Sequence, residues 1–192
     1  NTHISSAKSP EQIYDFSGFP TELYNVKYSP LGSPEIAHKV SELIPDVLVN
    51  TDRGLDHGSW TILKHIFPLA NIPVLQLSID LDKSIDYHFA LSKKLKLLRN
   101  MNVLILGSGN IVHNMFFANS KCNVEPYEWA VEFDEWVKDR LLHKDINSLI
   151  DLKKNDRIVK LSVPTLDHYL PLIYCLGVLE PEDSIEFTYE HI

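Results

Sequence analysis

The feature that most constrains the fold is a pair of apolar runs separated by a stretch with helical spacing. Residues 72–79 (Ile-Pro-Val-Leu-Gln-Leu-Ser-Ile) predict a strand bounded by Asn71 and Asp80. In residues 84–99 the apolar positions recur at three and four, which predicts a helix, and the apolar run 101–106 predicts a second strand. A nearly all-apolar strand after a crossover helix is typical of a parallel strand covered on both faces. We therefore predict an α/β fold, a single domain with a central, mostly parallel sheet flanked by helices.

Other segments fit the same class of fold. Ser33 and Pro34 are typical of the N-cap and first position of a helix, and the turn-rich, aromatic stretch before them, residues 13–32, predicts an ordered connector. Ligands are expected beyond Ile79 and Leu106, because the carboxyl ends of strands line the usual crevice of an open α/β sheet. Local patterns predict the remaining elements: strands at 47–49 and 185–188, and helices at 127–142, 146–152 and 168–179.

Charge and cysteine content argue against several classes of function. A formal net charge of −8 with scattered Lys and Arg argues against nucleic-acid binding, which needs clustered cations. No apolar run approaches the roughly 20 residues that cross a bilayer, so no membrane protein is expected. Cys122 and Cys175 lie far apart without metal-binding spacing, which favours a reduced, cytoplasmic setting. The 192 residues fit one domain, 1–192, and the sequence does not indicate an oligomeric state.

A glycine-rich segment, Gly107-Ser-Gly-Asn-Ile-Val-His113-Asn114, directly follows the second predicted strand. It is similar to a dinucleotide loop, but the third glycine of that fingerprint would fall at Val112, and no clear acidic residue ends a strand about 20 residues further on. A nucleotide-binding module is the alternative that this segment leaves open. His113 lies between Asn110 and Asn114, whose side chains can select which ring nitrogen is protonated. A structural histidine is the competing interpretation.

Two further histidines lie beside a carboxylate at a predicted boundary between loop and helix. His57, in Asp56-His57-Gly58, follows an aspartate able to raise its basicity and precedes a glycine that lets a substrate approach. His168, in Asp167-His168, opens the last predicted helix and is placed to face a crevice. A helix-capping role for either aspartate explains the same local spacing. The other six histidines are interpreted as structural or surface residues.

Together these segments resemble the class III extradiol ring-cleavage dioxygenase superfamily, in particular its group of 4,5-DOPA dioxygenase extradiol-like proteins. The resemblance covers nearly the whole chain. Several motifs in the same order are far more specific than any one of them, and they favour a functional interpretation of all three histidines. The segments that carry the resemblance are residues 14–20 (Tyr-Asp-Phe-Ser-Gly-Phe-Pro), 54–60 (Gly-Leu-Asp-His-Gly-Ser-Trp), 72–80, 107–114 and 164–171 (Pro-Thr-Leu-Asp-His-Tyr-Leu-Pro).

The resemblance implies an enzyme that inserts both atoms of dioxygen into a small aromatic diol beside its hydroxyls, giving a semialdehyde. It implies a divalent metal, Fe(II) in active enzymes and often Zn(II) in isolated ones, with open positions for the diol and dioxygen. His113 and His168 are the ligands retained in this chain. Related enzymes use a histidine on the loop matching His113 as the base, so both roles stay open for it. His57 is implied as an acid/base or substrate contact.

The chain departs from the family pattern in two places. The usual Pro-Glu before the last histidine is replaced by Leu166-Asp167, which keeps a carboxylate of shorter reach. The family's two other metal-site histidines lie in a Gly-His-Gly-Ser-Pro loop and a Ser-x-His-Trp strand end, and neither pattern exists here. Asn is the first residue and no Met precedes Met101. We therefore expect a domain that lacks its N-terminal strand and ligand loops, and a catalytically incomplete metal-binding fragment is the alternative to an active enzyme.

Overall fold

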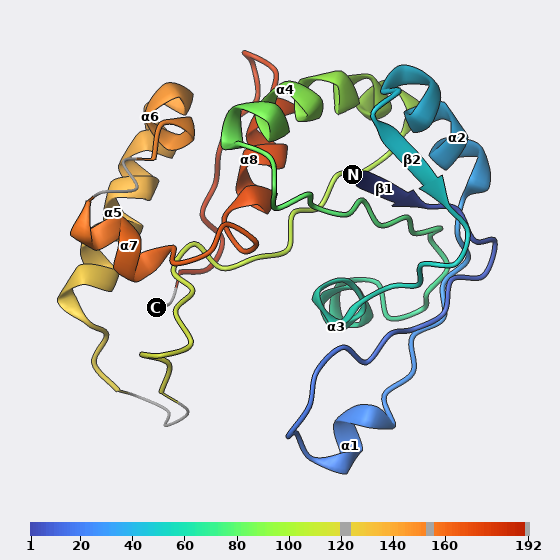
Figure 1. The fold of residues 1–192 in the computed structure, drawn as a ribbon, viewed down its shortest axis with the longest axis horizontal. Coiled ribbons are helices and arrows are strands. Elements are labelled where there is room, and N and C mark those ends of the chain that lie inside the picture. The colour runs from blue at the N-terminus through green and yellow to red at the C-terminus, as the bar shows by residue number, and fades with distance from the viewer. Residues whose placement is uncertain (120–123, 153–155, 191–192) are drawn as a thin grey trace. The chain divides into compact units, whose positions relative to one another are not determined.

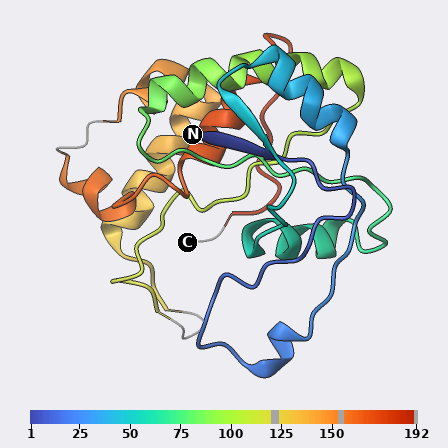
Figure 2. The ribbon, with the colours of Figure 1, turned by 45° about the vertical axis from the view of Figure 1, so that its right-hand side comes forward.

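In a computed structural model of the chain, two neighbouring parallel strands are connected by a crossover helix (Figure 1). β1 (Thr2–Ser5) and β2 (Val47–Asn50) are in register from Thr2 opposite Val47 to Ser5 opposite Asn50. α2 (Pro34–Leu43) joins them along the chain and contacts both strands, as Figures 1 and 2 show. Ser33 is its N-cap and Pro34 its first residue, as predicted. This strand–helix–strand arrangement confirms the α/β class.

The structure describes residues 1–119, 124–152 and 156–190. Packing within the chain divides it into two units, Asn1–Asp80 and Leu81–Ile192. Among the described residues, no helix is both long and apolar enough to cross a membrane.

In the first unit, the segment at 72–79 lies beside β1 without forming the predicted strand. Ser5 N donates to Gln76 O at 2.9 Å, and Ser78 N donates to His3 O at 2.8 Å. Two other backbone N–H groups donate to serine hydroxyls instead of carbonyls: Gln76 N donates to Ser5 Oγ at 2.7 Å, and His3 N donates to Ser78 Oγ at 2.8 Å. Side-chain oxygens therefore replace the carbonyls that a continuous ladder requires, and only an isolated bridge remains.

The rest of the first unit is the connector and the helix that packs on it. The connector contains α1 (Thr21–Tyr24), and α3 (His57–Ile66) follows β2. Their core is formed by the buried Tyr28, Trp60 and Leu63, and partly buried side chains surround it. The hydroxyl of Tyr28 donates to Phe67 O at 3.2 Å, which joins the connector to the end of α3. The predicted ordered connector is thereby confirmed.

Within its described residues, the second unit has only helices as regular structure. The predicted helices at 84–99, 127–142 and 146–152 are present. The helix predicted at 168–179 is shorter, at 170–177, and the sequence does not predict the helix at 157–162. Its elements are α4 (Ile85–Leu95), the 3-10 helix η1 (Lys96–Met101), α5 (Glu128–Leu142), α6 (Ile146–Ile150), α7 (Arg157–Ser162) and α8 (Leu170–Gly177).

The strands predicted at 101–106 and 185–188 are not formed. Met101 ends η1, and residues 103–106 continue without pairing to any strand among the described residues. Leu104 is 70% exposed and Leu106 42% exposed, so the apolar run is not covered on both faces. Apolar composition predicts a strand correctly only when a neighbouring strand supplies the hydrogen-bond partners, and the second unit supplies none within its described part.

α8 is held in place by close packing against α4. His88 on α4 is fully buried, and its Nδ1 lies 2.9 Å from the hydroxyl of Tyr174 on α8. At one contact between the two helices, a Cβ at Gly177 would lie 1.7 Å from Ser92 Oγ and 2.7 Å from Ser92 Cβ. The contact therefore depends on the missing side chain at Gly177. Because α8 begins at Leu170, this packing also fixes the segment directly before it.

Gly177→Ala is expected to destabilise the second unit. The added methyl group overlaps Ser92, and overpacking of this kind costs about 1–3 kcal/mol. Urea unfolding followed by circular dichroism measures the change. In a Ser92→Gly background the obstruction is gone, so the same substitution should cost clearly less there. An equal loss in both backgrounds would show that this helix contact does not limit stability.

Candidate functional site

Three side chains with metal-binding atoms meet in the second unit. His113, Asp167 and His168 each offer one ligand atom, and these atoms lie within 4.8 Å of one another. The imidazoles of His113 and His168 are stacked, with ring centroids 3.5 Å apart and planes 7° apart. His168 Nε2 lies 3.9 Å from Asp167 Oδ2. The fold thus brings together the two histidines that the sequence proposes as metal ligands and adds the carboxylate between them in the chain.

Two glycines let the His113 loop reach the start of α8. A Cβ at Gly109 would lie 2.3 Å from the carbonyl oxygen of His168, and one at Gly107 would lie 2.7 Å from the carbonyl oxygen of Pro171. Both positions therefore exclude any larger residue. The glycines serve backbone packing between two segments that are about 60 residues apart in the sequence, which is what places His113 against His168.

The same geometry removes the structural basis of the nucleotide-binding alternative. A dinucleotide fingerprint needs a strand before its glycines and a helix that starts directly after them. Residues 103–106 form no strand, and no helix begins in the described residues 107–119. The Gly107-Ser-Gly109 segment lacks the helix N-terminus at which such proteins bind phosphate.

Hydrogen bonds tie the His113 loop to α7 and to His168. His113 N donates to Ser162 O at 2.9 Å, at the end of α7. Asn110 N donates to His168 Nδ1 at 3.3 Å. The side chain of Asn114 instead donates to Leu161 O at 2.8 Å, which ties the loop to α7. The Asn114 side chain thus holds the loop rather than the His113 ring, whereas selection of the ring nitrogen by Asn110 stays a prediction.

Asp167 has one buried carboxylate oxygen, Oδ1, without a hydrogen-bond partner among the described residues. Partial burial alone would raise the pKa of Asp167, but hydrogen bonds from Thr165 and its own backbone N–H, with the nearby His168 and His113, hold that pKa below its usual value. The Asp167 side chain is 42% exposed, so its other oxygen is open to solvent or to a cation. Two imidazoles and a carboxylate are also a donor set that suits a divalent transition metal. The residues therefore fit a bound divalent cation.

The capping alternatives have different outcomes for the two aspartates. α8 begins at Leu170 with Tyr169 as its N-cap and has no side-chain cap, so the capping interpretation is wrong for Asp167. Asp56 is the N-cap of α3 and accepts a hydrogen bond from Ser59 N at 3.2 Å, so for it the capping interpretation is confirmed.

His57 lies in the first unit, as the first residue of α3. Its partner is Asp15 rather than the adjacent Asp56. His57 Nδ1 lies 2.9 Å from Asp15 Oδ1, and the backbone N–H of His57 donates to the same oxygen at 2.9 Å. The ring of Phe16 meets the imidazole edge to face, with centroids 5.7 Å apart.

Sequence reasoning missed Asp15 because the pair spans 42 residues and forms no local motif. Its only sequence signal is its place inside the Tyr14–Pro20 motif, where the flanking aromatic residues drew attention instead. The interpretation of His88 as structural agrees with its burial against Tyr174.

Comparison with known proteins places the whole chain in one family. The profile described as "Catalytic LigB subunit of aromatic ring-opening dioxygenase" matches residues 1–192. A protein named 4,5-DOPA dioxygenase extradiol from Escherichia coli K12 is 37% identical over 197 residues, covering all of this chain and 72% of that protein. One of the same name from Beta vulgaris is 35% identical over 184 residues, covering 93% of this chain and 68% of that protein.

A solved structure agrees with the sequence comparison. The crystal structure of an uncharacterized protein from Escherichia coli K12 superposes with a TM-score of 0.83 at 33% identity. It covers all of this chain, which in turn covers 75% of that protein.

Asp167→Asn is expected to weaken binding of Zn²⁺ by at least about tenfold, because the amide keeps the shape but removes the charge beside the two histidines. Calorimetric titration of the metal-free chain with Zn²⁺ measures the affinity. The matched control is Asp151→Asn, an exposed carboxylate in the same unit, which should leave the affinity unchanged. Equal affinities in the wild-type chain and the Asp167 variant would contradict a metal centre at this cluster.

Proposed function

The chain belongs to the family of catalytic LigB subunits of aromatic ring-opening dioxygenases, and from this membership we propose that it opens a catechol-type, DOPA-like diol with dioxygen. The cleavage is extradiol: the ring breaks beside the two hydroxyl-bearing carbons, both oxygen atoms enter the product, and a semialdehyde forms. The single observation that carries the proposal beyond the family is the cluster of His113, Asp167 and His168.

The proposed cofactor is a divalent metal held by His113 and His168, with Asp167 as a third ligand or a close ionic partner. Fe(II) is proposed for activity, and Zn(II) as an ion that the isolated protein can hold. When bound, the ferrous ion would supply Lewis acidity toward the diol and electrons for the activation of dioxygen. Support comes from the unpartnered Asp167 Oδ1 and from the donor set of two imidazoles and a carboxylate.

The chain's own residues supply proton transfer. A catechol must lose a proton before it binds through both oxygens, and imidazole is suited to accept that proton near neutral pH. We propose His57 for acid/base chemistry, because its side chain is 49% exposed and held by a carboxylate. His113 is proposed either as a ligand or as the base. As ligands of one ion, His113 and His168 would have to turn out of their stacked arrangement, because imidazole lone pairs lie in the ring plane.

The proposed setting is the reducing cytoplasm. Cys175 is a free, half-buried thiol, and burial raises its pKa, so at neutral pH it is protonated and unreactive. Cys122 lies outside the described residues. The oxygen-dependent reaction needs only the small diol and dioxygen as partners, and no nucleic acid or membrane is part of the proposal.

The anaerobically Fe(II)-loaded chain should consume one dioxygen for each catechol or DOPA opened. An oxygen electrode follows the consumption, and mass spectrometry after reaction with ¹⁸O₂ should find a labelled atom in the carboxylate of the ring-opened product, whose aldehyde oxygen exchanges with water. Resorcinol, whose hydroxyls are not adjacent, is the matched control substrate and should not react. His168→Ala should abolish uptake, whereas His143→Ala, an exposed histidine of the same unit, should not. No uptake with any adjacent diol, or a ring-opened product without label, would reject the proposed reaction.

A further inference from the structure

The contact between Asp15 and His57 has a defined hydrogen-bond polarity. One carboxylate oxygen, Asp15 Oδ1, lies 2.9 Å from both the backbone nitrogen and the ring Nδ1 of His57. An ionised carboxylate only accepts hydrogen bonds, so both nitrogens must be donors. In the neutral imidazole a proton on Nδ1 leaves Nε2 unprotonated, as an acceptor.

From this geometry we infer that Asp15 is a positioning residue, which holds the His57 imidazole in the tautomer whose Nε2 accepts a proton. The inference rests on the acid/base role proposed for His57 and adds a residue that acts through it. In the other neutral tautomer, Nε2 carries the proton and cannot accept one from the substrate. The backbone contact from His57 also fixes Asp15 itself, so the carboxylate does not depend on the ring for its position.

The partner of His57 is unambiguous because the adjacent carboxylate is already engaged. Asp56 accepts hydrogen bonds from the backbone and hydroxyl of Ser59, both at 3.2 Å, and from the side chain of Gln76. Arg53 Nη2 lies 3.6 Å from Asp56 Oδ2, the oxygen that also accepts from Gln76. These contacts direct the Asp56 carboxylate toward the cap of α3 and away from the imidazole.

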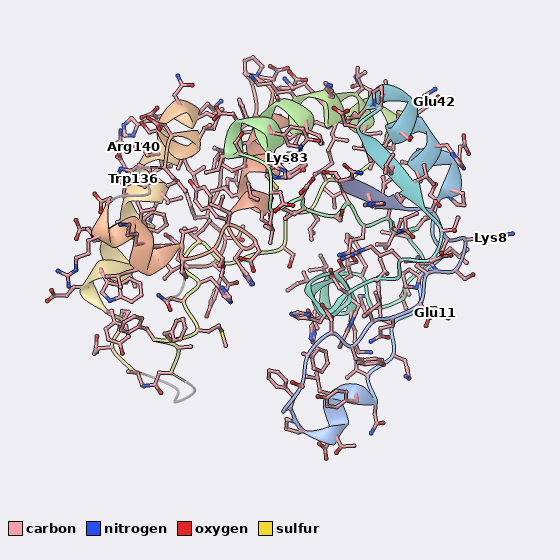
Figure 3. The ribbon with its side chains drawn as sticks, in the orientation of Figure 1. Lys8, Glu11, Glu42, Lys83, Trp136 and Arg140 are labelled. Carbon is pink, nitrogen blue, oxygen red and sulfur yellow. The ribbon has the colours of Figure 1, made fainter. Side chains whose placement is uncertain are left out.

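Backbone hydrogen bonds fix the distance between the two segments that carry the pair. Ile13 N donates to Leu55 O and Leu55 N donates to Glu11 O, each at 2.7 Å. Trp60 Nε1 on α3 donates to Ile13 O at 2.9 Å. A Cβ at Gly54 would lie 2.0 Å from the carbonyl oxygen of Glu11, a residue labelled in Figure 3, so this approach requires glycine.

Aromatic rings enclose the pair on the connector side and leave it open to solvent elsewhere. Phe16, next to Asp15, meets both His57 and Phe19 edge to face, at 5.7 and 5.5 Å between centroids. Tyr14, on the other side of Asp15, packs on Trp60 at 5.5 Å. The Asp15 and His57 side chains are 40% and 49% exposed, so a small diol can reach the imidazole.

The ionisation of Asp15 agrees with this arrangement. Partial burial alone would raise the pKa of Asp15, but hydrogen bonds from the backbone and side chain of His57 outweigh it and hold the pKa below its usual value. Asp15 is therefore a carboxylate at neutral pH.

The tautomer of His57 tests the inference directly, without any enzymatic turnover. Long-range ¹H–¹⁵N spectra of the ¹⁵N-labelled chain show which ring nitrogen carries the proton, and a His57→Gln variant assigns the signals. The wild-type chain should show neutral His57 protonated at Nδ1. Asp15→Asn should shift it toward Nε2–H, because the amide can donate to Nδ1. Asp46→Asn, an exposed control in the same unit, should leave the spectrum unchanged.

Kinetics of the Fe(II)-loaded chain then test whether Asp15 acts through His57. Asp15→Asn should lower kcat for catechol by at least about tenfold with KM changed less than about twofold, which is the range seen when partners of functional histidines are removed. Asp15→Glu should restore part of the loss. In a His57→Gln background, Asp15→Asn should cause no further loss.

The outcomes separate this inference from the proposed function. A wild-type His57 protonated at Nε2, or a tautomer that Asp15→Asn does not change, overturns the positioning role. An equal kinetic loss with and without His57 overturns it too. A wild-type chain that opens no diol rejects the proposed reaction, while the spectra still decide whether Asp15 sets the tautomer.

Discussion

The close approach of a glycine loop to the start of α8 is the constraint on which the candidate metal centre depends. With the His168 carbonyl only 2.3 Å from where a Cβ of Gly109 would stand, no side chain fits between the two backbones. α8 is a rigid partner in this contact: Leu170 and Ile173 are fully buried, and Tyr169 donates to Leu149 O at 2.9 Å. The imidazole of His113 is therefore held in a fixed position beside His168. A binding site needs rigidly held side chains, and this contact restricts the motion of the loop that carries one of them.

The first unit uses the same physical device for a different purpose. Gly54 lets the connector approach the segment before α3, and backbone hydrogen bonds set the distance. The result is a carboxylate–imidazole pair rather than a cluster of ligands. In both places a histidine meets a segment that is distant in the sequence, and in both places a glycine lets the two backbones approach. Two of the motifs that carry the family resemblance, 54–60 and 107–114, contain these glycines.

Much of the fold follows from local sequence signals, and the failures have a common cause. The helix after Ser33 and the long helix at 127–142 are predicted by capping and periodicity, which depend on near neighbours. The strand at 47–49 is predicted by its composition, whereas β1, with which it pairs in parallel, is not predicted. The strands at 72–79 and 101–106 are not formed, because a strand depends on partners that apolar composition does not specify. The single-domain prediction for 1–192 remains a prediction. His113 and His168 are predicted through ordered motifs, but Asp15 and the non-capping role of Asp167 arise from contacts across the chain, which local spacing cannot distinguish from ordinary helix caps.

The central claim is that His113, Asp167 and His168 form a metal centre, and anomalous X-ray diffraction from crystals of the Zn²⁺-loaded chain tests it most directly. The account predicts an anomalous peak at the zinc edge about 2.0–2.2 Å from a nitrogen of each of the two histidines, with Asp167 in or next to the coordination shell. A fully loaded crystal in which the zinc peak lies elsewhere and the two imidazoles remain stacked on each other would contradict it.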